Sequence, residues 1–161
     1  MAYVNYEYYS SLYGNKAIPE TDFNRLLWDA EREIDKATSG VDNVRKLEVA
    51  FPTKERDAEA IKRCVCALVE FLKNLEVAES GANYVKDSSG TVHGGIVQSV
   101  SAGNESIGYA TTDTYVSNAI KSVKDRDLTV YAFIASRLHD VVDANGVNLL
   151  YAGRYPYRVE V

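Results

Sequence analysis

An apolar repeat in the middle of the chain constrains its fold more than any other feature. Apolar residues alternate three and four positions apart over this stretch, so they share one face of an α-helix. Pro52 ends the preceding segment and Thr53 suits a helix cap, so we predict a helix from Thr53 to about Ser80. A helix with such a stripe needs other elements to cover it. The residues of the stripe are Ala58, Ile61, Val65, Leu68, Leu72 and Leu75.

The same spacing recurs earlier, after the first proline of the chain. Pro19 suits the start of a helix, and Glu20 and Asp22 lie where the positive end of the helix dipole favours acidic side chains. Gly40 suits its end. We therefore predict a second amphipathic helix between Pro19 and Gly40. Its apolar positions are Phe23, Leu26, Leu27, Ala30, Ile34 and Ala37.

Two shorter helical segments are predicted on either side of this helix. The stretch YEYYSSLYG forms a short turn that ends at Gly14, and DNVRKLEVAF forms a short helix that Asp42 caps and Pro52 ends. Of the twelve tyrosines, five lie in the first thirteen residues, and they either fill half-buried positions or contact another molecule. The tyrosines that share one face of the first turn are Tyr6, Tyr9 and Tyr13.

A last helical segment follows the capping residues TTDT. Asp127 interrupts its stripe, so we expect either a kink or two abutting helices there. Asn145 and Gly146 close the segment, and His139 lies near its end, where the dipole favours an imidazole. Together these segments predict a mainly α protein, a single domain over residues 1–161 built as a bundle of three to five helices. The stripe consists of Val116, Ile120, Val123, Val130, Ile134, Leu138 and Val141.

The stretch IVQSVSAGNESIGYA, residues 96–110, alternates like a strand. Gly103-Asn104 suits a two-residue turn, which predicts a β-hairpin with Val100 opposite Ile107. A two-stranded hairpin is marginal alone in water, so this protruding arm, about residues 92–111, packs either on its own helices or on a neighbouring molecule. The residues expected to make that contact are Ile96, Gln98, Val100, Ile107 and Tyr109.

The tail VNLLYAGRYPYRVEV, about residues 147–161, is predicted to be extended because Pro156 disfavours a helix. It either covers its own domain or docks on a partner, and its Tyr and Arg content favours the partner. The residues expected to dock are Leu150, Tyr151, Arg154, Tyr155, Tyr157 and Arg158.

Net charge and hydropathy bear on what the chain binds. The formal net charge of −5 argues against nonspecific binding of nucleic acid, which needs Lys and Arg to neutralise phosphates. No apolar run approaches the ~20 residues that a spanning helix needs, so we expect no membrane contact. The opening MAYVNYEYY lacks the basic and apolar parts of a signal peptide, so the expected compartment is intracellular and reducing.

The residues that carry catalysis do not form a recognisable constellation. The motifs GxSxG, HExxH, GxGxxG and GxxxxGK are missing, so we expect no enzymatic activity. Cys64 and Cys66, with only two histidines in the chain, are a poor metal site, and we expect neither a metal nor a cofactor. Cys64 flanks the apolar stripe and is predicted to be a small buried hydrophobe.

Four signatures, in this order along the chain, resemble one protein family. They are the lead and helix YEYYSSLYGNKAIPETDFNRLLWDAEREID, the helix core DAEAIKRCVCALVEFL, the loop VQSVSAGNESIGYA and the near-terminal LLYAGRYP. Over most of its length the chain thus resembles the head–tail connector, or adaptor, proteins of long-tailed bacteriophages that infect Gram-positive bacteria.

The resemblance implies a structural role in the virion. Such connectors form a ring, typically dodecameric, under the portal of the filled head. The ring extends the channel for double-stranded DNA, which passes without tight binding, and it carries a head-closure protein and then the tail. By this resemblance the arm reaches a neighbouring subunit or the channel, and the tail from Val147 to Val161 docks on the portal. The protein would assemble in the host cytoplasm and reside at the head–tail interface.

Other functions stay open on the sequence alone. A neck or tail-completion protein one tier lower would have similar features. A monomeric helical regulator that binds a small ligand or a host protein is also compatible with the composition. A DNA-binding factor would retard duplex DNA in a salt-sensitive way, which the net charge of −5 argues against.

Overall fold

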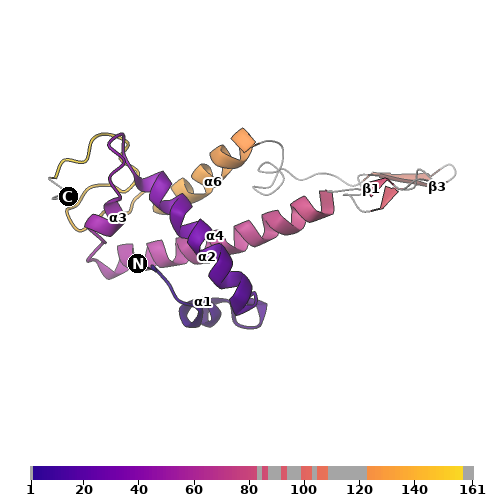
Figure 1. Ribbon diagram of the computed structural model, residues 1–161, viewed down its shortest axis with the longest axis horizontal. Coiled ribbons are helices and arrows are strands. Elements are labelled where there is room, and N and C mark those ends of the chain that lie inside the picture. Colours follow the sequence, from indigo (N-terminus) through magenta and orange to yellow (C-terminus); the bar gives the residue numbers. More distant parts are fainter. Residues whose placement is uncertain are drawn as a thin grey trace. The chain divides into compact units, whose positions relative to one another are not determined.

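The computed structural model describes residues 2–82, 85–86, 92–93, 99–102, 105–108 and 123–157. The described part is mainly helical, as predicted (Figure 1). Contacts divide the chain into a first unit, Met1–Leu72 with Val130–Val161, and a second unit, Lys73–Thr129. We describe each unit by itself.

The first helix, α1 (Tyr6–Tyr13), has a defined start and end. The Asn5 side chain accepts a hydrogen bond from the Tyr8 N–H at 2.9 Å, which satisfies a free donor of the first turn. Gly14, at φ 54°, ends the helix in a left-handed conformation that favours glycine, and the short 3₁₀ turn η1 (Gly14–Lys16) follows. The predicted end at Gly14 is therefore confirmed.

The helix α2 (Glu20–Thr38) follows Pro19 and buries the predicted stripe, with a difference at its end. Thr38 is buried and Ala37 is half-buried. Thr38 lies one turn after Ile34, and its hydroxyl donates to the Ile34 carbonyl at 2.9 Å, so the buried hydroxyl is satisfied. The buried face of α2 thus ends at Thr38, a polar residue whose hydroxyl is hydrogen-bonded within the helix.

The short helix α3 (Lys46–Val49) forms where expected, but Asp42 does not cap it. Its N-cap is Arg45, and a carboxylate oxygen of Asp42 accepts the backbone N–H of Tyr155 instead. The prediction for Asp42 was wrong because its partner lies far along the sequence, and nothing local signals it.

The helix α4 (Glu55–Ala82) is the long helix that the central repeat predicts. The stripe is buried from Ile61 to Leu75, whereas Ala58 is half-buried. Further α4 residues, among them Cys66 and Phe71, are buried too. Phe71 stacks on Phe133 of α6 (Val123–Leu138) with ring centroids 4.9 Å apart, so α4 is covered on more sides than the stripe alone predicts.

The helix α6 (Val123–Leu138) runs through Asp127 without a break. It ends at Leu138, before the predicted end at Asn145, and the chain turns there. One carboxylate oxygen of Asp143 accepts the N–H groups of Asn145 and Val147 at 2.9 and 2.8 Å, which stabilises the turn. Four stripe residues are buried as predicted, and the first two lie outside the described residues. The buried ones are Val130, Ile134, Leu138 and Val141.

Among its described residues, the second unit has four short strands and the ends of two helices. Strand β1 (Val85–Lys86) pairs with β2 (Val92–His93), and β3 (Ser99–Ala102) pairs with β4 (Glu105–Gly108), both antiparallel. In the second pair Val100 lies opposite Ile107. The predicted turn at Gly103-Asn104, and the arm residues Ile96, Gln98 and Tyr109, lie outside the described residues, so the protruding arm stays a prediction.

The ends of α4 and α6 are joined within this unit by an ion pair. A guanidinium nitrogen of Arg126 lies 3.3 Å from a carboxylate oxygen of Glu79. No helix in the described ranges combines the length and hydropathy needed to cross a bilayer.

Candidate interaction surfaces

The C-terminal segment of the first unit is held by a buried lysine. Lys46 of α3 is fully buried, and its ammonium group donates to the carbonyls of Leu149 and Tyr151 at 3.0 and 2.5 Å. Burial lowers the pKa of Lys46, and the nearby carboxylates of Asp143 and Asp42 act in the opposite direction. A buried cation with two carbonyl acceptors fixes the backbone that carries them.

Tyr155 forms a second attachment of the same segment. Its side chain is buried, and its hydroxyl donates to a carboxylate oxygen of Asp143 at 2.5 Å. Its backbone N–H donates to Asp42 at 2.8 Å, and this bond is the main cause of the lowered pKa of Asp42. Burial and the bond to Asp143 raise the pKa of Tyr155. Tyr155 therefore belongs to the protein's own fold.

A close approach of two glycines completes the attachment. The Val41 N–H donates to the Ala152 carbonyl at 3.1 Å. A Cβ atom added at Gly40 would lie 2.2 Å from the Gly153 carbonyl oxygen, so the backbones can approach only because residue 40 has no side chain. Gly40 suits the end of a helix by its residue type, but its packing role against Gly153 depends on a distant segment that nothing local in the sequence signals.

The attached segment leaves several contact-forming side chains exposed. Tyr151 and Tyr157 are each 50% exposed, Arg154 is exposed, and Val41 beside them is also exposed. We call Val41, Tyr151, Arg154 and Tyr157 the C-terminal surface. Of the other residues expected to dock, Leu150 is half-buried, and Arg158 lies outside the described residues.

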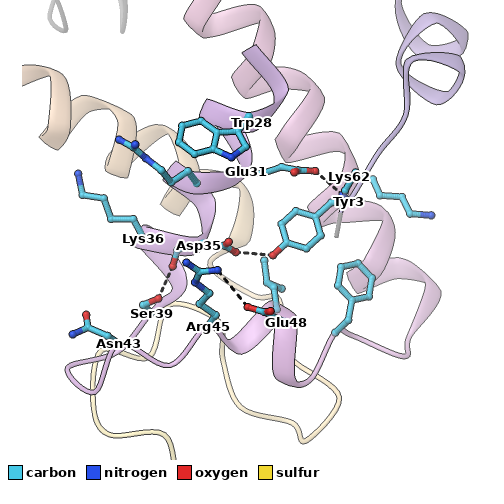
Figure 2. Close-up of a pocket in the computed structure, with 14 residues that line it drawn as sticks. Tyr3, Trp28, Glu31, Asp35, Lys36, Ser39, Asn43, Arg45, Glu48 and Lys62 are labelled. Atoms are coloured by element: carbon cyan, nitrogen blue, oxygen red, sulfur yellow. Dashed lines mark hydrogen bonds and ion pairs between the residues drawn. The ribbon is translucent and has the colours of Figure 1, made fainter. Parts of the chain in front are cut away.

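A second surface feature is a groove in the first unit, with a volume of about 920 Å³. It is lined by one side of α2, the residues around α3, the N-terminal residues and Lys62 of α4 (Figure 2). Trp28 lines it and is 63% exposed. The sequence carries one signal for this groove. The only tryptophan of the chain lies outside the apolar stripe of α2, so the core of that helix does not account for it.

Tyr3 lines one side of this groove, and both its backbone and its side-chain hydroxyl are hydrogen-bonded to α2. Its backbone N–H donates to Glu31 at 2.5 Å and its hydroxyl donates to Asp35 at 2.6 Å. Its ring stacks on Phe51 with centroids 5.9 Å apart. Burial raises the pKa of Glu31, and burial with the bond to Asp35 raises the pKa of Tyr3.

The two cysteines are buried in α4, as predicted for Cys64. Burial raises the pKa of both the Cys64 and the Cys66 thiol to about 12, so both stay protonated and unreactive at neutral pH. Within the described ranges, no three side chains of His, Cys, Asp or Glu gather where they could hold a metal ion.

Comparisons with protein-family models, with curated proteins and with solved structures found no match to this chain. The resemblance to head–tail connectors therefore stays a prediction that rests on the sequence signatures.

Proposed function

We propose that this chain is a structural virion protein, a head–tail connector that forms a ring under the portal, extends the DNA channel and joins the phage head to the tail. One observation carries the proposal. The C-terminal segment is attached to its own subunit, yet the side chains of Tyr151, Arg154 and Tyr157 stay exposed. Tyr and Arg are favoured at protein contacts, and a preordered segment loses little conformational entropy on binding.

In this proposal the C-terminal surface docks on the portal, and the arm at about 92–111 contacts a neighbouring subunit or the channel. The ring then carries a head-closure protein and the tail. No enzymatic step is required, because the free energy comes from contacts between protein surfaces. With a net charge of −5, the subunits let DNA pass without binding its phosphates tightly.

The test is binding to purified portal rings of the same virus, measured by sedimentation and electron microscopy. We expect a ring of this protein on the portal, and we expect Tyr151→Ala with Arg154→Ala to weaken binding by about tenfold or more. Tyr131→Ala is the matched control, since Tyr131 of α6 is 48% exposed against 50% for Tyr151. No association with the portal, or equal binding by the double variant, would contradict the proposal. Binding only after another neck protein is added would instead favour the lower tier.

A further inference from the structure

We propose that Asn145 is a site of spontaneous deamidation, and that its conversion to aspartate or isoaspartate weakens the attachment of the C-terminal segment. Asn145 is the only asparagine of the chain that is followed by glycine, and both residues of the pair are exposed. The side-chain amide is the substrate and water is the co-reactant. The proposal concerns how the segment is held on its own subunit, so it can fail or succeed independently of docking on the portal.

The reaction joins the backbone nitrogen of Gly146 to the side chain of Asn145. The nitrogen loses its proton to solvent and attacks Cγ, the bond between Cγ and Nδ2 breaks, and the amide group takes up a proton and leaves as ammonia. Water then opens the resulting succinimide at either of its two carbonyl carbons, which gives aspartate or isoaspartate.

The conformation of the turn explains why it contains such a reactive pair. Gly146 lies at φ 78°, a left-handed conformation that favours glycine, so the turn itself requires glycine directly after Asn145. Glycine has no Cβ atom to hinder ring closure, and asparagine is among the chemically labile residue types. The residue type that suits the turn is therefore also the one that makes the Asn145 amide most reactive.

The folded turn restrains both groups that must react. The Gly146 N–H donates to the Asp143 carbonyl at 3.0 Å, so the attacking nitrogen is engaged as a donor. The Asn145 amide donates to the Tyr155 hydroxyl at 2.9 Å, and its carbonyl accepts the Tyr157 hydroxyl at 3.2 Å. Deamidation therefore requires the turn to open, and its rate depends on how often the C-terminal segment detaches locally.

Neither product fits the hydrogen bonds of the closed turn. The Tyr155 hydroxyl gives its only proton to Asp143 at 2.5 Å and accepts the Asn145 amide through its oxygen. A carboxylate in place of this amide has no proton to donate at neutral pH and adds a second negative charge beside Asp143. Isoaspartate adds a backbone carbon between the N–H groups of residues 145 and 147, which share one oxygen of Asp143. Each deamidation event thus leaves the segment less well held than before.

The first test measures the site of deamidation. The full-length folded protein is incubated at mildly alkaline pH and digested with trypsin, and the peptide of residues 138–154 is analysed by mass spectrometry with fragmentation. A sample digested at zero time corrects for deamidation during digestion. We expect a one-dalton increase at Asn145 and not at Asn148, which lies in the same peptide but is followed by leucine.

The second test measures how the attachment controls the rate. The chain unfolded in guanidinium chloride should deamidate several-fold faster than the folded protein. Lys46→Met should lie between the two, because it removes the donor to the Leu149 and Tyr151 carbonyls without touching the turn. Tyr155→Phe, which removes only a hydroxyl, should also react faster than the wild type. Lys54→Met is the control and should match the wild type, and circular dichroism checks that all variants are folded.

The third test measures the consequence for stability. Asn145→Asp reproduces one product, so it should lower the urea midpoint and speed amide hydrogen exchange at Leu149. Asn24→Asp makes the same chemical change at an exposed position of α2 and should change the midpoint little. Equal deamidation rates in the folded and the unfolded chain, rates in both Lys46→Met and Tyr155→Phe equal to the wild type, or equal midpoints for the two aspartate variants would overturn the proposal.

Discussion

Lys46 carries a positive charge at a place that water does not reach. Its ammonium group is satisfied by the carbonyls of Leu149 and Tyr151, and the nearby Asp143 adds an opposite charge. Removing one partner of a buried polar contact leaves the other partner unsatisfied, which costs more than the contact itself contributes. The attachment of the C-terminal segment therefore depends strongly on one side chain of α3.

Lys46→Met should lower the free energy of unfolding by about 1–3 kcal/mol, because the carbonyls of Leu149 and Tyr151 lose their donor. Urea unfolding followed by circular dichroism measures this change. Amide hydrogen exchange should show faster exchange at Leu149 and Tyr155, which lie in the attached segment. Lys54→Met is the control, since Lys54 is exposed just before α4 and its replacement should change stability little. An unchanged unfolding curve for Lys46→Met would contradict this role.

Buried thiols and phenols make the fold sensitive to alkaline pH. Burial raises the pKa of Cys64 and Cys66 from the ordinary value of 9.0 to about 12, and the pKa of Tyr9 is raised by burial and by its bond to Glu70. In the unfolded chain these groups lose their protons near their ordinary pKa values of 9.0 for Cys and 10.0 for Tyr, whereas in the folded chain they keep their protons to higher pH. The unfolded state therefore binds fewer protons, and stability present below about pH 9 is lost as the pH rises toward about 12.

The measurement is the urea midpoint between about pH 8 and about pH 11, which should fall steadily. Cys64→Ala with Cys66→Ala should show a shallower decline than the wild type, because two of the titrating groups are gone, although its midpoint at neutral pH is lower. A midpoint that does not change over this range would show that burial of these groups does not control stability.

At the scale of elements, α2 and α4 could be predicted because an amphipathic helix is a local pattern. The side chains that face the core recur at fixed spacing, and Pro19 and Gly14 mark boundaries within the same few residues. The C-terminal attachment could not be predicted in this way, because Lys46 and Leu149 are 103 positions apart. The docking role of Tyr151 rests on its residue type and stays a prediction, whereas the burial of Tyr155 depends on the distant Asp42 and the nearby Asp143.

The groove at Trp28 could not be predicted from the sequence for the same reason. It forms where one side of α2 meets Tyr3 and Phe51, and the hydrogen bond between Tyr3 and Asp35 spans 32 positions.

The end of α6 at Leu138 could not be predicted for a different reason. A stripe that continues to Val141 reads as helix, yet the side chain of Asp143 stabilises a turn that the periodicity does not reveal.

The predicted arm belongs to this scale as well. Deleting residues 97–109 should leave the helical signal in circular dichroism nearly unchanged, because β3 and β4 pair with each other and the core of the first unit lies elsewhere. The deletion should abolish ring formation on the portal, measured by electron microscopy. Binding of a single subunit to the portal through the C-terminal surface should persist. A loss of the helical signal would instead mean that the arm packs on its own subunit.

At the scale of the whole molecule, the net charge of the protein disfavours tight binding of DNA. The chain carries 18 Lys and Arg residues against 23 Asp and Glu residues, which gives a formal net charge of −5. The proposed ring would repeat this charge around its channel. Repulsion between acidic subunits and phosphates prevents a tight complex, which suits a conduit because bound phosphates would retain the passing genome.

The net charge predicts that the protein does not retard duplex DNA at physiological salt, measured by gel mobility up to about 100 μM protein, the weak end of the range of nonspecific dissociation constants. Lowering the salt should not produce a steep increase in affinity, because binding driven by phosphate contacts requires cations that release counterions. A ring on the portal should behave like the free subunit, since assembly concentrates the acidic charge. Salt-sensitive retardation by the free protein would identify a DNA-binding factor, and the conduit role would then lose its electrostatic basis.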